Sequence, residues 1–166
     1  MTRFPKPGHT LAAIWPALVG TLAVFYAAIG DGAWTRRSAI AWMMGSWGAR
    51  LAVQASYTRI PDLPPVASYL RLLSLALLFS APAFFASLNP EPSLTVMELG
   101  AAALWVLAFA GETTADRGRL GFVRRPHTVC EALIWTAFAL FASASPWGWL
   151  AFACPVARLY LLRRRY

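Results

Sequence analysis

The sequence has few charged residues for its length. Of its 166 residues, 13% are charged, about half of the ~25% that is usual in soluble globular proteins. Hydrophobic residues make up 58% of the chain, which is more than a soluble fold of this size can remove from water. The shortage of charge therefore excludes an ordinary cytosolic enzyme and a disordered chain. It predicts an all-α protein, a polytopic transmembrane helical bundle formed by one domain over residues 1–166.

Acidic residues and lysine are scarcer still. Seven Asp and Glu stand against 15 Lys and Arg, a net charge of +8, and Lys6 is the one lysine. A basic balance can indicate nucleic-acid binding, but these arginines are spaced between apolar stretches and form no patch on a polar domain. We therefore expect membrane lipids as partners and no nucleic acid.

Cysteine is also rare, and two familiar kinds of site are missing. Cys130 and Cys154 are too few for a disulfide framework. They lie at different distances from a turn near Pro146, so we expect no disulfide between them. The sequence contains no glycine-rich phosphate loop and no group of ligands at zinc spacing, and we expect no metal site.

What the sequence does have is a series of apolar stretches. We predict six spans, near residues 11–29, 39–56, 66–87, 94–111, 129–143 and 148–162. The first would be about 28 Å long as a helix, which matches a ~30 Å hydrocarbon core and exceeds the apolar part of a cleaved signal peptide. Residues 129–162 are too many for one span, and a turn at 143–148 predicts that the last two spans form a helical hairpin.

The distribution of Lys and Arg predicts the orientation. If the N-terminus is cytoplasmic, only Arg36 and Arg37 lie in segments on the opposite side. The cytoplasmic segments then hold Arg3, Lys6, Arg59, Arg117, Arg119, Arg124, Arg125, Arg163, Arg164 and Arg165. This bias predicts that both termini are cytoplasmic, in a membrane that we expect to be the bacterial inner membrane.

Four tryptophans lie at or near the predicted ends of spans. They are Trp34, Trp47, Trp147 and Trp149. Amphipathic indole rings at span ends anchor at the level of the lipid headgroups, so we expect all four at the membrane surface. Glycines Gly20, Gly45, Gly48 and Gly100 are expected to let helices approach closely.

Charged residues inside the predicted spans are candidates for function because they are costly in a membrane. Arg50, Arg71, Glu131 and Arg158 all fall near the cytoplasmic side, whereas Glu98 falls toward the outside. For Arg71 and Arg158, side chains that reach the headgroups are the simpler interpretation. For Arg50 and Glu131 we expect pairing inside the bundle, because hydrocarbon would leave their polar groups unsatisfied.

A polar segment, 112–128, lies on the same side as these charges. Glu112 and Asp116 are four residues apart and would share one face of a helix. Their mutual repulsion favours a nearby cation, or a ligand that offers hydrogen-bond donors. The alternative is a solvated acidic face among arginines.

The same region resembles a known family. Gly111-Glu-Thr-Thr-Ala-Asp116, followed by Arg124-Arg-Pro-His-Thr-Val-Cys-Glu131, resembles the signature of the steroid 5-alpha-reductase-like membrane family. That family includes the DUF1295 proteins and is related to sterol reductases and isoprenylcysteine carboxyl methyltransferases. Upstream, Trp47-Gly-Ala-Arg50-Leu resembles the family's W-x-x-R-L motif, so the resemblance covers roughly residues 43–162.

The resemblance implies a membrane-embedded reductase that uses NADPH. The cofactor would enter from the cytoplasm, and hydride would pass to a carbon–carbon double bond, such as that of an enone, in a lipid-like substrate. The residues implied in cofactor binding are Arg50, Glu112, Asp116, Arg124, Arg125, His127 and Glu131. No catalytic residue is assigned.

The chain also departs from the family pattern. Thr128 stands where the family has tyrosine, Cys130 stands where it has glycine, and the loop before Arg124 is very short. These departures favour an alternative, a non-catalytic membrane scaffold or accessory subunit that packs against a partner subunit. A third hypothesis is a methyltransferase of the isoprenylcysteine type, with S-adenosylmethionine in the same cytoplasmic pocket.

Overall fold

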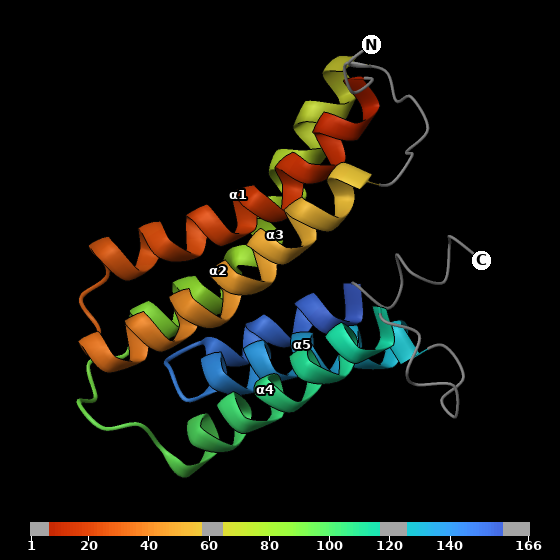
Figure 1. The fold of residues 1–166 in the computed structure, drawn as a ribbon. Helices are drawn as coiled ribbons and strands as arrows, with labels where there is room; N and C mark the ends of the chain where they lie inside the picture. Colours follow the sequence, from red (N-terminus) through yellow and green to blue (C-terminus); the bar gives the residue numbers. More distant parts are fainter. Residues whose placement is uncertain (1–6, 58–64, 117–125, 158–166) are drawn as a thin grey trace.

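The computed structural model describes residues 7–57, 65–116 and 126–157, and within these residues every regular element is helical (Figure 1). The expected all-α class is therefore confirmed. The elements are α1 (Pro7–Ile29), α2 (Trp34–Tyr57), α3 (Pro65–Ser87), α4 (Val96–Asp116), α5 (Pro126–Ser143) and the short 3-10 helix η1 (Gly148–Phe152).

Local sequence explains where these helices begin. Pro7, Pro65 and Pro126 are the first residues of α1, α3 and α5, where a missing backbone N–H costs nothing and a fixed φ favours the helix. α4 begins with a capping box. The Thr95 hydroxyl accepts a hydrogen bond from the Glu98 backbone N–H at 3.2 Å, and the Glu98 carboxylate accepts one from the Thr95 N–H at 2.7 Å.

Several helices are longer than the apolar stretches that predicted them. α3 agrees closely with the expected stretch, but α2 begins at Trp34 instead of near residue 39, and α4 continues to Asp116 instead of ending near 111. Arg36 and Arg37, which we expected in a loop, therefore lie in the first turn of α2. Hydropathy places the ends too early because it treats a charge as an end, whereas here the charges have partners on a neighbouring helix.

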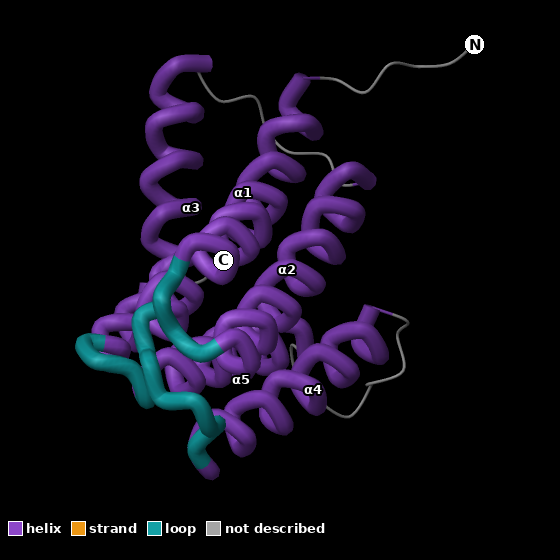
Figure 2. The backbone as a smooth tube through the Cα atoms, turned by 90° about the vertical axis from the view of Figure 1, so that its left-hand side faces the viewer, coloured by secondary structure: helices purple, strands orange, loops and turns teal. Residues whose placement is uncertain are grey.

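The helices run up and down in two groups that meet along α5. α1, α2 and α3 form one group, α4 packs on α5, and α5 contacts α2 and α3 (Figure 1). Three connections, residues 30–33, 88–95 and 144–147, gather at one end of the molecule, which we call the loop end (Figure 2). The starts of α1, α3 and α5 and the ends of α2 and α4 lie at the opposite end, the terminal end, toward which the two groups diverge (Figure 1).

Backbone hydrogen bonds and one asparagine hold the loop end together. The Gly32 N–H donates to the Ser87 carbonyl at 2.9 Å, and the Ala33 N–H donates to the Asn89 carbonyl at 3.1 Å. The Asn89 side-chain amide donates to the Ala144 carbonyl at 2.9 Å. All three connections are thus linked to one another.

The chain turns back after α5. α5 ends at Ser143, and η1 runs back along α5 and continues as α-helix to residue 157 (Figure 1). The turn places Trp147 at φ 60°, a left-handed conformation that is rare for a bulky residue. Gly148 follows it, and a Cβ there would lie 1.8 Å from the Ala142 carbonyl oxygen, so no other residue type fits without movement of the backbone.

Glycines bring α1 and α2 close together. A Cβ on Gly20 would lie 3.4 Å from the Gly45 Cα, and a Cβ on Gly48 would lie 2.5 Å from the Pro16 carbonyl oxygen. Three of the four glycines that were expected in helix contacts therefore have that role. Gly100 does not, because nothing lies within 4 Å of the position of its Cβ.

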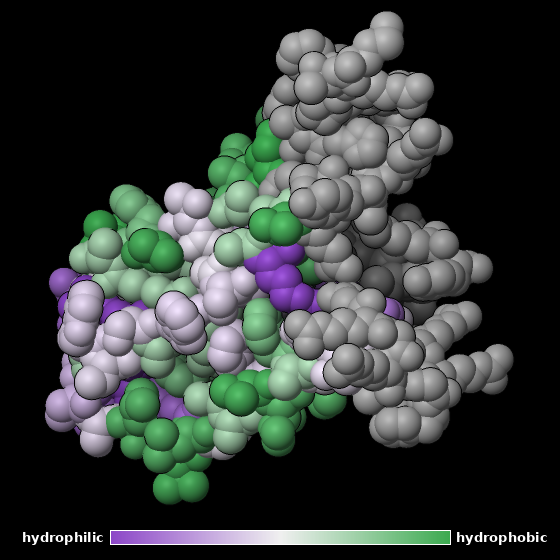
Figure 3. Space-filling view, in the orientation of Figure 1, coloured by the Kyte–Doolittle hydropathy of each residue, from purple (hydrophilic) through white to green (hydrophobic). Residues whose placement is uncertain are grey.

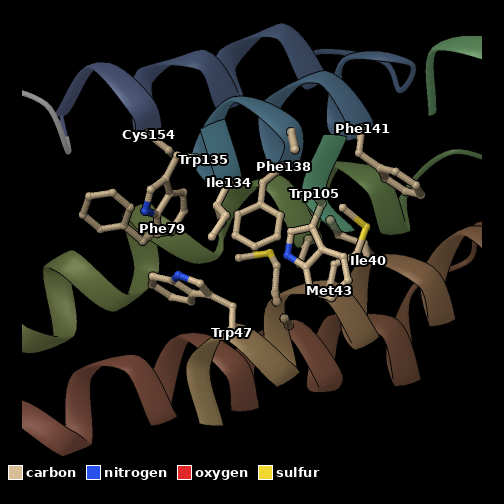
Figure 4. Packing of buried hydrophobic residues seen from close by; sticks show 14 of the residues in the cluster. Ile40, Met43, Trp47, Phe79, Trp105, Ile134, Trp135, Phe138, Phe141 and Cys154 are labelled. Carbon is tan, nitrogen blue, oxygen red and sulfur yellow. The ribbon is translucent and has the colours of Figure 1, made fainter. Parts of the chain in front are cut away.

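An aromatic cluster forms the core between the two groups of helices (Figure 4). Trp47 is fully buried and meets Trp135 edge-on with ring centroids 4.9 Å apart, and Trp135 lies 4.6 Å from Phe79. The expectation that Trp47 anchors at the headgroups is wrong. Because α2 begins at Trp34, Trp47 lies more than three turns inside the helix and faces α5.

The helices differ in whether their length and hydropathy suit a membrane span. Among the described residues, one helix, Val96–Ala115, is both long and apolar enough to cross a bilayer. The other apolar helical stretches, Ile14–Ile29, Leu72–Ser87, His127–Ser143 and Gly148–Ala157, fall below that length.

Candidate functional site

Two arginine–glutamate ion pairs connect α2 to α4. Arg36 pairs with Glu98 near the loop end, and Arg50 pairs with Glu112 nearer the terminal end. The partners are 62 residues apart in both pairs. α2 and α4 run in the same direction (Figure 1), and 14 residues separate the two pairs on each helix, a rise of about 21 Å.

The Arg36–Glu98 pair is completely buried. The Arg36 Nη2 donates to Glu98 Oε2 at 2.9 Å and to the Ser93 carbonyl at 2.8 Å, and its Nε donates to Glu98 Oε1. Its Nη1 donates to the carbonyls of Asn89 and Glu91. Every nitrogen of this guanidinium has a partner, so the pair ties the 88–95 connection and the start of α4 onto α2.

The Arg50–Glu112 pair is more accessible. The Arg50 Nη1 donates to Glu112 Oε2, and the side chains of the two residues are 16% and 6% exposed. The Arg50 guanidinium also lies 5.3 Å from the centre of the Phe109 ring, a cation–π arrangement. Figure 3 shows a strongly hydrophilic area in the seam between α2 and the α4–α5 pair, with hydrophobic surface above and below it.

α4 and α5 approach closely beside this pair. A Cβ on Gly111 would lie 3.1 Å from the Cys130 sulfur, a tight contact that would require the buried thiol to shift slightly. Cys130 lies within electrostatic range of Glu112 and Arg50. The described part of the site thus consists of Arg50, Phe109, Glu112 and Cys130, brought by α2, α4 and α5.

The residues that the sequence predicted are distributed unevenly around this pair. Arg50 pairs inside the bundle, as expected, and its partner is Glu112. Glu131 is buried on α5, and His127 is exposed in the first turn of α5. Asp116 is the last residue of α4, in the same helix as Glu112.

Several predicted residues lie outside the description. The side chain of Asp116 is not among those described, and the same holds for Arg71. Arg124, Arg125 and Arg158 lie in segments beyond the described ranges. Among the described residues, the contact between the 47–51 motif and the 111–116 motif is therefore the one between Arg50 and Glu112.

Sequence reasoning missed the Arg36–Glu98 pair. It assigned Arg36 to a loop and left Glu98 alone on the outer side. A usable signal was present, because the 14-residue interval between Arg36 and Arg50 recurs between Glu98 and Glu112. In an up-and-down bundle the second and fourth helices are parallel, so equal intervals place both pairs in register.

Comparison with known proteins identified no relative: no protein family, curated protein or solved structure matches this chain. The resemblance to the steroid 5-alpha-reductase-like family therefore rests on the motifs alone.

Proposed function

We propose that this chain is an integral membrane protein whose helices cross the bilayer. The observation that supports this most strongly is the inverted distribution of polarity. Arg36, Glu98 and Glu112 are buried, whereas many large apolar side chains are exposed. The exposed set along the helices includes Val24, Phe25, Ile29, Leu73, Leu77, Phe84, Leu99, Val106 and Leu107. So many exposed apolar side chains are unfavourable in water and favourable in lipid.

The dimensions of the helices support several spans. α1 to α4 contain 21 to 24 residues and α5 contains 18, which correspond to lengths of about 27–36 Å around a ~30 Å hydrocarbon core. Of the apolar stretch Val96–Ala115, only 28% is buried inside the protein, which suits a helix that faces lipid. We propose the segment that returns along α5 as the sixth span, although its described part, Gly148–Ala157, is shorter than a bilayer requires.

Fractionation tests this proposal. We expect the full chain to remain in the membrane pellet after alkaline carbonate washing and to be released only by detergent. Release by carbonate alone would contradict membrane integration.

For the activity, we propose an NADPH-dependent reductase that acts on a lipid-like enone or double bond. The observation that carries this is the contact between Arg50 and Glu112, because the two residues come from separate motifs of the resemblance. A guanidinium that binds a carboxylate is equally suited to phosphate oxygens, and carboxylates can accept hydrogen bonds from ribose hydroxyls. NADPH would supply the hydride, while Arg50 and Glu112 would bind and orient the cofactor.

A second candidate, a non-catalytic membrane scaffold, has an observation of its own. Arg50 and Glu112 neutralise each other, and they are spaced along α2 and α4 like the purely structural pair Arg36–Glu98. A pair of this kind can hold two helices together without any ligand.

Nucleotide binding by the detergent-solubilised protein distinguishes the candidates. The reductase predicts that NADPH raises the thermal stability of the wild type and that Glu112→Gln and Arg50→Gln lose this response. The scaffold predicts no response to NADPH and a fixed partner subunit that co-purifies. Stabilisation by S-adenosylmethionine in place of NADPH would indicate the methyltransferase.

A further inference from the structure

Arg36 and Arg37 are neighbours in the chain but have opposite surroundings. Arg36 is fully buried, and each of its nitrogens is hydrogen-bonded. Arg37 is only partly buried. Its Nη1 donates to the Ala27 carbonyl at the end of α1 at 2.7 Å, and its Nε has no partner among the described residues. It forms no ion pair with a described carboxylate, although Asp31 is exposed on the connection just before α2.

The Arg37 guanidinium lies against an exposed tryptophan. It is 5.6 Å from the centre of the Trp34 ring, and 69% of Trp34 is exposed. The stacked ring limits the positions that the guanidinium can take. The Nη1 group thus donates one N–H to Ala27, and the Nε is buried without a partner among the described residues. The donors that can meet a ligand are the remaining N–H groups of Nη1 and Nη2.

The loop end carries further exposed aromatic residues. Trp147, in the turn after α5, is 69% exposed, and Trp149, in η1, is 60% exposed. The 144–147 connection and the start of α2 at Trp34 both lie at the loop end. In a protein that crosses a bilayer, a ring of exposed tryptophans lies at the level of the headgroups. At that depth the anionic group available to Arg37 is a lipid phosphate.

We propose that Arg37, stacked on Trp34, binds the phosphate of a membrane phospholipid at the loop end. This rests on the membrane part of the proposed function and is independent of the reductase activity. A guanidinium presents paired N–H donors that match two phosphate oxygens, while the indole ring remains among the upper acyl chains and the headgroups. The Ala27 carbonyl fixes the guanidinium from the protein side.

The test is lipid retention in detergent, measured by native mass spectrometry with added phosphatidylglycerol. We expect the wild type to bind one phospholipid more tightly than Arg37→Gln does, by about tenfold, which is the loss typical of one charge-assisted hydrogen bond. Trp34→Leu should weaken the same binding. Trp149→Leu, which removes an exposed indole at the same end without touching Arg37, should leave it unchanged.

Two further measurements keep the outcome decisive. Inorganic phosphate should not displace the lipid or protect the protein from thermal unfolding. If free phosphate protects the protein as well as phosphatidylglycerol does, the site is not a lipid site. Helical circular dichroism checks that the variants fold. If Arg37→Gln does not fold, Trp34→Leu still tests the site. Equal lipid retention by all variants would refute the site alone. Failure of the wild type to partition into detergent micelles would refute the membrane proposal and the site with it.

Discussion

At the scale of single residues, burial separates the two arginine–glutamate pairs. Arg36 and Glu98 have no contact with solvent, and removal of either leaves a buried charge without its counter-charge. Arg50 keeps 16% of its side chain exposed, so water can replace part of the interaction that Arg50 would lose if Glu112 were removed. The same chemistry therefore has different energetic consequences at the two positions.

We predict that Glu98→Gln and Arg36→Met each destabilise the protein by about 3–5 kcal/mol, the cost of breaking a buried ion pair from one side. The double variant Arg36→Met/Glu98→Leu should recover most of that loss because neither charge remains. Unfolding in mixed detergent micelles measures both effects. Single variants as stable as the wild type would contradict the buried pairing.

For the other pair we predict a smaller loss, about 1.5–3 kcal/mol for Glu112→Gln. Exchange of the charges, Arg50→Glu with Glu112→Arg, should restore stability but not the binding of an anionic cofactor. The matched comparison with the Arg36–Glu98 variants separates a role in ligand binding from a role in holding the helices.

At the scale of elements, glycine decides how closely α1 and α2 pack. Gly48 faces the Pro16 carbonyl, and no side-chain atom fits between them without separation of the helices. Gly100 on α4 faces open space. The same substitution to alanine is therefore expected to have opposite effects at Gly48 and at Gly100.

We predict that Gly48→Ala destabilises the protein by about 1–3 kcal/mol through overpacking. Gly100→Ala should be neutral or should stabilise the protein by up to about 1 kcal/mol, because alanine is the better helix former. Thermal unfolding of the two variants under identical conditions gives the comparison. Equal effects at both positions would mean that α1 and α2 do not touch at Gly48.

At the scale of the whole molecule, the buried Arg36–Glu98 pair changes the count of charges on which the proposed membrane orientation rests. Arg36 is neutralised by Glu98 inside the protein. In the membrane orientation that we propose, Arg37 is then the one described arginine at the loop end that faces the headgroups. Asp31 and Glu91 are exposed at that end. The asymmetry in charge between the two ends is therefore stronger than the sequence count suggested.

We predict that the loop end faces away from the cytoplasm. A cysteine introduced at Glu91 should react with an impermeant maleimide in intact cells, whereas one introduced at Arg119 should react only after the membrane is opened. Because Cys130 and Cys154 are buried, they should contribute little background, and a variant with both changed to serine provides the control. Labelling at position 119 in intact cells would reverse the orientation.

Part of this fold could be predicted from the sequence because it depends on local chemistry. Apolar runs predicted the helical class, proline-containing stretches predicted the breaks, and residues 66–87 were predicted almost to the residue as α3. The ends of α2 and α4 were misplaced because a charge reads as an end in a hydropathy pattern. Trp47 was misplaced for the same reason, since its depth depends on where α2 begins.

The sequence by itself determined that the chain forms apolar helices, because hydropathy and helix propensity are properties of neighbouring residues. Only the tertiary structure decided which charges meet. Arg36 and Arg50 find carboxylates 62 residues away, and that choice depends on which helices lie side by side and in which register.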